Sequence, residues 1–175
     1  MCIRDRPSYV LGGRMMEKMA NIDDVQDYID QNYWALENNV ILIDEFLQNA
    51  KEVDVDVLRD NQGNTMIAGI MEHIEEAGIH SGDSACSIPP FSLNDKIITD
   101  IKKFSISLVN ELKILGLMNI QYAIKDDEIF ILEANPRASR TIPFLAKAIG
   151  IPFIKIAAEL IVGKTLTEEY QNFDN

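Results

Sequence analysis

The stretch "EVDVDVLRDNQGNTMIAGIM", residues 52–71, decides the fold class of this chain. Val53, Val55 and Val57 alternate with three acidic residues, and a period of two is typical of a strand with one apolar and one polar face. The segment "DNQGN" then supplies a turn into a second apolar run, "TMIAGIM". Residues 51–72 therefore predict an antiparallel hairpin.

The pattern repeats further along the chain. "MNIQYAI" (118–124) and "EIFILEA" (128–134) flank Asp126 and Asp127, which predicts a second antiparallel hairpin. A long helix is expected between the hairpins, at about residues 93–115, ending at Gly116. In a doubly wound fold, strands would alternate singly with helices. Two hairpins exclude that arrangement and favour an α+β fold with a cleft between two antiparallel sheets.

The remaining elements complete an α+β layout. Ile22, Val25, Ile29 and Tyr33 recur at helical spacing, and "VILIDEFL" (40–47) reads as a short strand. Two helices are expected after the second hairpin. The last one should run from about Pro152 to Gly163, with proline at its start and glycine at its end.

Composition limits the classes of protein that this chain can belong to. It has 175 residues, of which 47% are hydrophobic and 25% charged, as expected for a globular chain with one sizeable core. No apolar run has the length of a membrane helix, and no secretory leader is visible. A net charge of −12 argues against nucleic acid as the main partner. Cys2 and Cys86 give no disulfide framework, so a cytoplasmic location without a membrane partner is expected.

The two ends of the chain differ from its middle. "MCIRDR" carries three charges and no periodicity, so residues 1–6 are expected to be a non-native or unpacked start. Residues 166–175 are polar and predict a tail or linker. The domain is therefore expected to cover residues 7–165 and to be part of a longer protein.

The candidate site lies in "ILEANPRASR", residues 131–140. Glu133 and Asn135 are two positions apart on a strand and so project from one face. Carboxylate and amide oxygens suit Mg²⁺, and Gln121 on the partner strand is a third candidate ligand. Arg137 and Arg140 follow, with guanidinium groups that can hold phosphate oxygens. The pattern is typical of a metal–polyphosphate site.

Each signal also has a structural interpretation. An Asn-Pro pair is common in turns, and a Glu–Arg pair is often a simple ion pair. Glu52 fits the polar face of a half-buried strand, and His80 in "GIHSGDS" fits a structural role. Gly12-Gly13 lacks the lysine and Ser/Thr of a P-loop. The residues alone support a candidate nucleotide–magnesium domain, and no more.

The metal hypothesis places a condition on the second hairpin. A two-residue turn at Asp126-Asp127 pairs Gln121 with Leu132 and sends Glu133 to the opposite face. A shared ion therefore requires an odd loop or a β-bulge that brings Gln121 opposite Glu133.

Five segments resemble the large subunit of the carbamoyl phosphate synthase family, in the family's order and from Pro7 to about Thr165. They are "PSYVLGGRMMEKM", "EVDVDVL", "GIMEHIEEAGIHSGDSACSIPPFSL", "LGLMNIQYAI" and "ILEANPRASRTIPFLAKAIGIPF". The combination of "HSGDS" and "NPRASRT" is highly specific. "RPSYVLGGR" and "HSGDSACSIP" resemble the second of the subunit's two synthetase halves, which have the ATP-grasp fold and of which the second phosphorylates carbamate.

The resemblance implies roles for individual residues. Nucleotide contacts fall on Arg14 (phosphates), Glu45 and Leu47 (adenine edge), Glu52 (ribose), and Gly78, Ile79, His80 and Ser81. Metal ligands fall on Gln121, Glu133 and Asn135, of which the first two also belong to the nucleotide site. Arg137 and Arg140 match the catalytic arginines that hold carbamate and the transferring phosphate. Glu45 stands where the family has a histidine, which leaves the adenine edge open.

The implied activity is an ATP-grasp ligase that makes carbamoyl phosphate and ADP from carbamate and ATP, for pyrimidine and arginine biosynthesis. The implied ions are Mg²⁺ or Mn²⁺, with K⁺ as a further candidate. The implied partners are the rest of the large subunit and a glutaminase small subunit. The piece alone is expected to be inactive. Two alternatives remain: an inactive ATP-grasp homologue that acts as a scaffold or interaction subunit, and a biotin carboxylase-like ligase.

Overall fold

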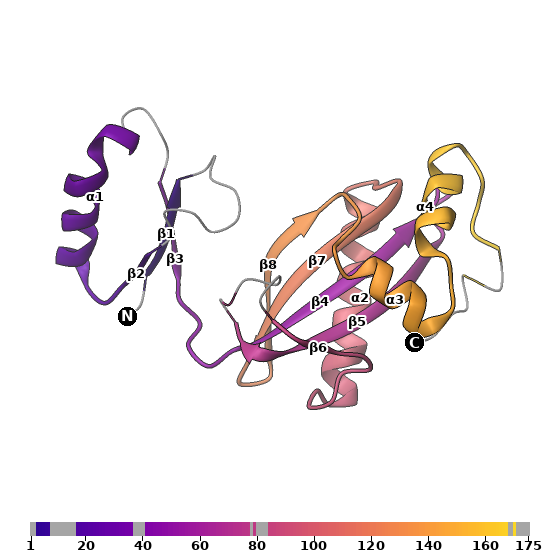
Figure 1. Ribbon diagram of the computed structural model, residues 1–175, viewed down its shortest axis with the longest axis horizontal. Coiled ribbons are helices and arrows are strands. Elements are labelled where there is room, and N and C mark those ends of the chain that lie inside the picture. The colour runs from indigo at the N-terminus through magenta and orange to yellow at the C-terminus, as the bar shows by residue number, and fades with distance from the viewer. Residues whose placement is uncertain are drawn as a thin grey trace. The chain divides into compact units, whose positions relative to one another are not determined.

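The computed structural model describes residues 3–7, 17–36, 41–77, 79, 84–167 and 170 (Figure 1). The chain forms two compact units, Met1–Gln48 and Asn49–Asn175, which are described separately below. Within the described residues, no helix is long and apolar enough to cross a membrane.

The first unit contains a three-stranded antiparallel sheet of order β2-β1-β3 and one helix. The strands are β1 (Ile3–Pro7), β2 (Glu17–Met19) and β3 (Ile41–Glu45). The helix α1 (Ile22–Leu36) begins after Asn21, whose side-chain oxygen accepts hydrogen bonds from the next turn. Met19, Val25 and Tyr28 form a small core between the sheet and α1. The expected helix and the strand in 40–47 are both present.

The start of the chain differs from the expectation of an unpacked segment. Ile3–Pro7 form the central strand of the small sheet, and Ile3 pairs with both Met19 and Glu45. The segment gave no strand pattern of its own, because three of its five residues are charged. Its pairing with β2 and β3 is not visible in the local sequence.

The second unit is built on a five-stranded antiparallel sheet of order β6-β5-β4-β7-β8 (Figure 1). The first predicted hairpin is confirmed as β4 (Lys51–Arg59) and β5 (Thr65–Glu76), and β6 (Cys86–Ser87) pairs with β5. The second is confirmed as β7 (Gly116–Lys125) and β8 (Glu128–Asn135). Because β7 pairs with β4, the two hairpins join into one sheet with β4 at its centre.

Helices cover both faces of this sheet. The helix α2 (Asp95–Glu111) packs on one face, and α3 (Ile142–Ile149) and α4 (Phe153–Ile161) pack on the other. The predicted extent of α2 was too long at its C-terminal end. The chain leaves the helix at Leu112, and Gly116 is the first residue of β7, where its positive φ of 89° suits glycine.

The two closing helices follow the proline and glycine signals. α4 begins after Pro152 and is followed by Gly163, which has a φ of 98°. α3 ends at Gly150, with a left-handed φ of 83°. Both are typical helix ends, because glycine adopts a left-handed backbone conformation without steric cost.

The central strand β4 is buried on both faces, which corrects the expectation of a half-buried strand. Val53, Val55 and Val57 pack into the core under α2, as their alternation predicts. The carboxylates on the opposite face are also buried: Glu52 is 5% exposed, Asp54 2% and Asp56 0%. Burying a charge without polar partners costs several kcal/mol. These three carboxylates therefore require polar partners inside the domain.

Asp60 fixes the turn of the first hairpin and joins it to the end of the domain. Its carboxylate accepts hydrogen bonds from the backbone of Gln62 and Asn64, from the Asn64 amide, and from Leu166 N at 3.0 Å. Burial alone would raise the pKa of Asp60, but these hydrogen bonds hold it below its ordinary value of 3.8. Leu166 itself is buried against α4, so the start of the expected polar tail belongs to the core.

Replacing Asp60 with alanine should lower the free energy of unfolding by about 3 kcal/mol, because one buried and two part-buried backbone donors lose a charged acceptor. Urea denaturation at pH 7 measures this loss. The control is Asp100→Ala, whose carboxylate makes a surface ion pair with Lys103 and should contribute less than about 1 kcal/mol. The difference between wild type and Asp60→Ala should shrink below about pH 4, as Asp60 becomes protonated. Equal effects of the two substitutions would contradict this role.

Candidate active site

A β-bulge in β8 meets the register condition for a shared metal ion. From the turn, Lys125 pairs with Glu128 and the pairing continues in step to Tyr122 with Ile131. The next pair is Gln121 with Glu133, so Leu132 is an extra residue on β8. Both turn residues have positive φ, at 51° and 62°, as a tight two-residue hairpin requires. The bulge thus places Gln121 and Glu133 opposite each other and on one face.

The same face carries a two-dimensional array of polar side chains. One cross-strand row contains Asp54, Gln121 and Glu133, and the next contains Asp56, Asn119 and Asn135. Asn135 donates a hydrogen bond from Nδ2 to Glu133 Oε1 over 2.7 Å. Because neighbouring strands lie about 4.8 Å apart, side chains that are adjacent in a row, such as Gln121 and Glu133, are within reach of a common ligand.

The donor set fits a hard cation. Gln121, Glu133 and Asn135 are all half-buried and offer carboxylate and amide oxygens. Among the described residues, no group of three or more His, Cys, Asp or Glu side chains is arranged to hold a metal. An ion at the predicted position would therefore have one carboxylate and two amides from the protein. Mg²⁺ suits such a set, because it is commonly held by one or two carboxylates together with substrate phosphates and water.

The loop between β8 and α3 carries the two predicted arginines. Arg137 and Arg140 are exposed, and both follow directly from the end of β8. The Arg137 amide donates to Asn135 O over 2.8 Å, which makes the chain turn sharply after the strand. Thr141 then precedes α3, so the arginines lie between the Glu133–Asn135 pair and the first turn of a helix.

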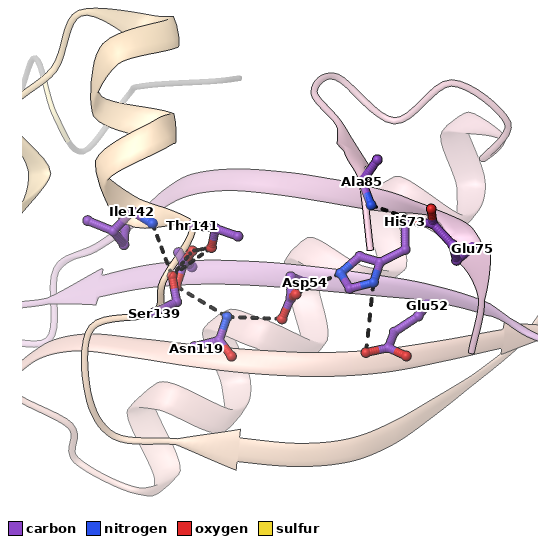
Figure 2. Close-up of polar contacts among 10 residues, drawn as sticks. Glu52, Asp54, His73, Glu75, Ala85, Asn119, Ser139, Thr141 and Ile142 are labelled. Carbon is purple, nitrogen blue, oxygen red and sulfur yellow. Dashed lines mark hydrogen bonds and ion pairs between the residues drawn. The ribbon is translucent and has the colours of Figure 1, made fainter. Parts of the chain in front are cut away.

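A buried polar network explains how the acidic face of β4 is tolerated (Figure 2). Asn119 Nδ2 lies 3.2 Å from Asp54 Oδ1 and 3.3 Å from Asp56 Oδ1, so one amide contacts both carboxylates. Ser139 and Thr141 donate their hydroxyl hydrogens to Asp56 Oδ2, over 2.8 and 3.0 Å. Residues from β4, β7 and the arginine-bearing loop therefore share one network.

His73 extends this network toward Glu52. Its Nε2 lies 2.8 Å from Asp54 Oδ2, and its Nδ1 lies 4.0 Å from Glu52 Oε1. Burial alone would lower the pKa of His73, but the hydrogen bond to Asp54 and the charges of Asp54, Glu52 and Glu75 raise it above its usual range. A protonated His73 offsets part of the buried negative charge.

The pKa of Asp56 shows the opposite balance. Burial raises it from 3.8 to about 6, although the hydrogen bonds from Ser139, Thr141 and Asn119 lower it. Asp54 adds to the rise through charge repulsion. This carboxylate is therefore ionised at neutral pH at a cost to stability.

The other predicted contacts divide between the two units. Glu45 ends β3 and is exposed, and Leu47 is half-buried in the short segment that follows the strand. Glu52 and Ile79 belong to the second unit, and the Ile79 side chain is exposed. Four further positions lie outside the described residues: Arg14, Gly78, His80 and Ser81.

Sequence reasoning missed the residues that support the site. Asp54 and Asp56 were visible in "EVDVDVL" but were assigned to a polar strand face, and His73 was not singled out. No local pattern signalled this burial, because β4 has a hairpin partner on one side only, β5, and its other neighbour, β7, lies far along the chain. Ser139 and Thr141 gave no signal, since their partner lies more than 80 residues earlier in the chain.

Comparison with known proteins assigns the family. Residues 2–169 match the family model described as carbamoyl-phosphate synthase L chain, ATP binding domain. The chain is 55% identical over 163 residues to the carbamoyl phosphate synthase large chain of Synechocystis sp., covering 93% of this chain and 15% of that one. The large chain of Xanthomonas axonopodis pv. citri is 49% identical over 169 residues, with 94% of this chain and 16% of that one covered. The chain thus spans about a sixth of the length of these relatives.

Solved structures agree on the fold. A biotin carboxylase from Campylobacter jejuni, in complex with β,γ-ATP, superimposes with a TM-score of 0.82 at 16% identity, covering 98% of this chain and 39% of that one. The biotin carboxylase domain of a 2-oxoglutarate carboxylase from Hydrogenobacter thermophilus, in complex with MgADP, ADP and bicarbonate, gives 0.78 at 17% identity, covering 95% and 37%. These neighbours are ATP-grasp domains, so the expected fold is confirmed. The chain belongs to the family of carbamoyl phosphate synthase large-chain ATP-binding domains.

Proposed function

We propose that this domain phosphorylates carbamate with ATP and releases carbamoyl phosphate and ADP. The observation that carries the proposal is the bulge-aligned group of Gln121, Glu133 and Asn135 beside a loop with two arginines. The family assignment supports ATP-dependent carbamoyl phosphate synthesis. The choice of carbamate rests on the likeness of "HSGDSACSIP" to the second half of the large subunit.

In the proposed mechanism, a carbamate oxygen attacks the γ-phosphorus, and the bond from that phosphorus to the β–γ bridging oxygen breaks. Carbamate is already an anion, so the step requires no general base, and none is assigned among these residues. Bound Mg²⁺ supplies charge neutralisation at the β- and γ-phosphates. Glu133 and Gln121 would hold the ion from adjacent strands, with Asn135 beside them.

The arginines are assigned to the reacting groups. Arg137 and Arg140 donate hydrogen bonds to the carbamate and to the non-bridging oxygens of the transferring phosphoryl group. Positioning and charge stabilisation supply most of the rate enhancement in phosphoryl transfer, which suits a site composed of cations and oxygen ligands. Glu52 is assigned to the ribose, with Mn²⁺ as an alternative to Mg²⁺ and K⁺ as a further ion.

The full activity belongs to a larger assembly in this proposal. The chain covers 15% to 16% of its relatives, so the rest of the large chain and a glutaminase small subunit are proposed partners. Pyrimidine and arginine biosynthesis are the proposed pathways, in the cytoplasm. An inactive homologue that serves as a scaffold is the second candidate.

The reverse partial reaction separates these proposals. The intact large chain carrying this domain should form ATP from carbamoyl phosphate and MgADP, and Arg140→Ala should abolish this formation. Bicarbonate-dependent ATP hydrolysis without ammonia should persist, because it belongs to the other half. The 175 residues alone, as a control, should bind MgATP weakly and show no turnover.

Loss of the bicarbonate-dependent reaction alone would reassign the domain to the first half. If neither reaction changed in Arg140→Ala, the proposed role of the arginine would be wrong, and the scaffold interpretation would gain support.

A further inference from the structure

The loop from Pro136 to Thr141 is anchored to the centre of the sheet through one buried carboxylate. Asp56 on β4 is 0% exposed, and it accepts hydrogen bonds from Ser139 and Thr141, which follow it by 83 and 85 residues. The two hydroxyl oxygens also lie 2.7 Å from each other. Asp56 Oδ2, Ser139 Oγ and Thr141 Oγ1 thus form a closed triangle.

The anchored residues lie on either side of Arg140. Ser139 precedes it and Thr141 follows it, and Figure 2 shows these two side chains beside each other. The backbone of Arg140 is therefore held at both ends. Ser139 Oγ also accepts a hydrogen bond from Ile142 N over 3.2 Å. The same contact therefore fixes the first turn of α3, and the Arg140 guanidinium projects from a short segment with few backbone alternatives.

Packing alone does not account for an aspartate at this position. Its neighbour on β5 is Gly69, which has no side chain, and its neighbour on β7 is Asn119. The pKa of Asp56 is raised to about 6 by burial, so the ionised form at neutral pH costs stability. An apolar residue would avoid that cost but would leave the two hydroxyls of the loop without this acceptor.

We propose that Asp56 is a positioning residue for the reaction: it fixes the backbone on both sides of Arg140 and thereby sets where that guanidinium meets the transferring phosphoryl group. The proposal rests on the proposed function for the role of Arg140. The anchoring itself does not depend on that function and can be measured separately.

The first test removes the hydroxyls and leaves the sheet intact. In the intact large chain, the double variant Ser139→Ala/Thr141→Val should form ATP from carbamoyl phosphate with a kcat lower by on the order of 10²-fold, a loss typical of misplaced reacting groups. The KM for ADP should stay within about twofold, because the loop is assigned to the phosphoryl group. The matched control is Ser107→Ala/Thr99→Val on the exposed side of α2, which should leave kcat unchanged.

The second test uses the conservative replacement of Asp56. Asp56→Ala removes the anchor and should reproduce the loss in kcat. Asp56→Asn keeps a hydrogen-bonding group of the same shape and should recover activity to within about fivefold of wild type. If Asp56→Ala does not fold, the hydroxyl variants decide the question. Unchanged kcat in the double variant, or equal losses in Asp56→Asn and Asp56→Ala, would overturn the proposal.

The third test is independent of catalysis. ¹⁵N relaxation of the chain without nucleotide should give the Arg140 amide an order parameter near 0.85 in wild type and below about 0.6 in the double variant. An unchanged order parameter would overturn the anchoring. If the wild-type loop were rigid but the protein transferred no phosphoryl group, the proposed function would be wrong. Asp56 would then have no positioning role in the reaction. The anchor itself would then be purely structural.

Discussion

Glu133→Gln should lower the rate of carbamoyl-phosphate-dependent ATP formation by about 10²- to 10³-fold, a loss typical when one preorganised charge-stabilising group is removed. Glutamine keeps the shape of the side chain and its contact with Asn135 but removes the negative charge opposite Gln121. Glu133 is the one carboxylate in the proposed ligand set, so its charge should contribute most to Mg²⁺ binding.

Kinetics and metal titration of the intact large chain check this result together. The Mg²⁺ concentration required for half-maximal rate should rise by at least about tenfold, as for other losses at metal sites. The matched control is Glu128→Gln, an exposed carboxylate at the turn end of the same strand. It should leave both the rate and the Mg²⁺ dependence unchanged. A Glu133→Gln protein with wild-type Mg²⁺ dependence would rule out Glu133 as a ligand.

Asp56→Asn should make the domain more stable at neutral pH. The pKa of Asp56 is raised from 3.8 to about 6 in the folded state, so the folded protein binds a proton more tightly than the unfolded chain. The contribution of Asp56 to the free energy of unfolding is therefore fully present below about pH 4 and is lost as the pH rises through 6. The free energy at stake is roughly 3 kcal/mol. Asparagine does not titrate. The free energy of unfolding of Asp56→Asn minus that of wild type should therefore rise by roughly 3 kcal/mol between pH 4 and pH 7.5.

Urea denaturation of the two proteins across this range measures the difference directly. Because Asp60 and His73 titrate in both proteins, their contributions cancel in the comparison. Asp100→Asn serves as the control, since this carboxylate is half-exposed on α2 and its difference from wild type should change little with pH. A constant difference between wild type and Asp56→Asn over the whole range would show that the buried carboxylate does not titrate as proposed.

The sequence predicted the parts of the fold that depend on local patterns. Alternating valines predicted the first hairpin, two apolar runs around Asp126-Asp127 predicted the second, and Pro152 and Gly163 marked α4. The end of α2 was misplaced because Gly116 carries a helix-end signal but opens a strand. The pairing of Ile3–Pro7 was missed because three of its five side chains are charged.

The candidate site was predictable only to its first layer. The residue types and spacing of Glu133, Asn135 and Gln121 predicted them as metal ligands. The metal hypothesis in turn required the bulge that aligns them. The burial of Glu52, Asp54 and Asp56 could not be read from alternation, which distinguishes two faces without showing what covers them. The loop before α3, far along the chain, contacts Asp56, whereas Asp54 and Glu52 face His73 of β5.

The bulge at Leu132 divides one strand into two segments with opposite phase. Before it, even-numbered Phe130 lies on the same face as Ala123; after it, odd-numbered Glu133 and Asn135 occupy that face. The apolar segment 129–131 beside the turn and the polar segment 133–135 therefore each alternate regularly, but with opposite parity. A search for related sites by strict alternation along this strand would reject the very chains that share the geometry. Such a search should treat the two segments separately and join them at the bulge.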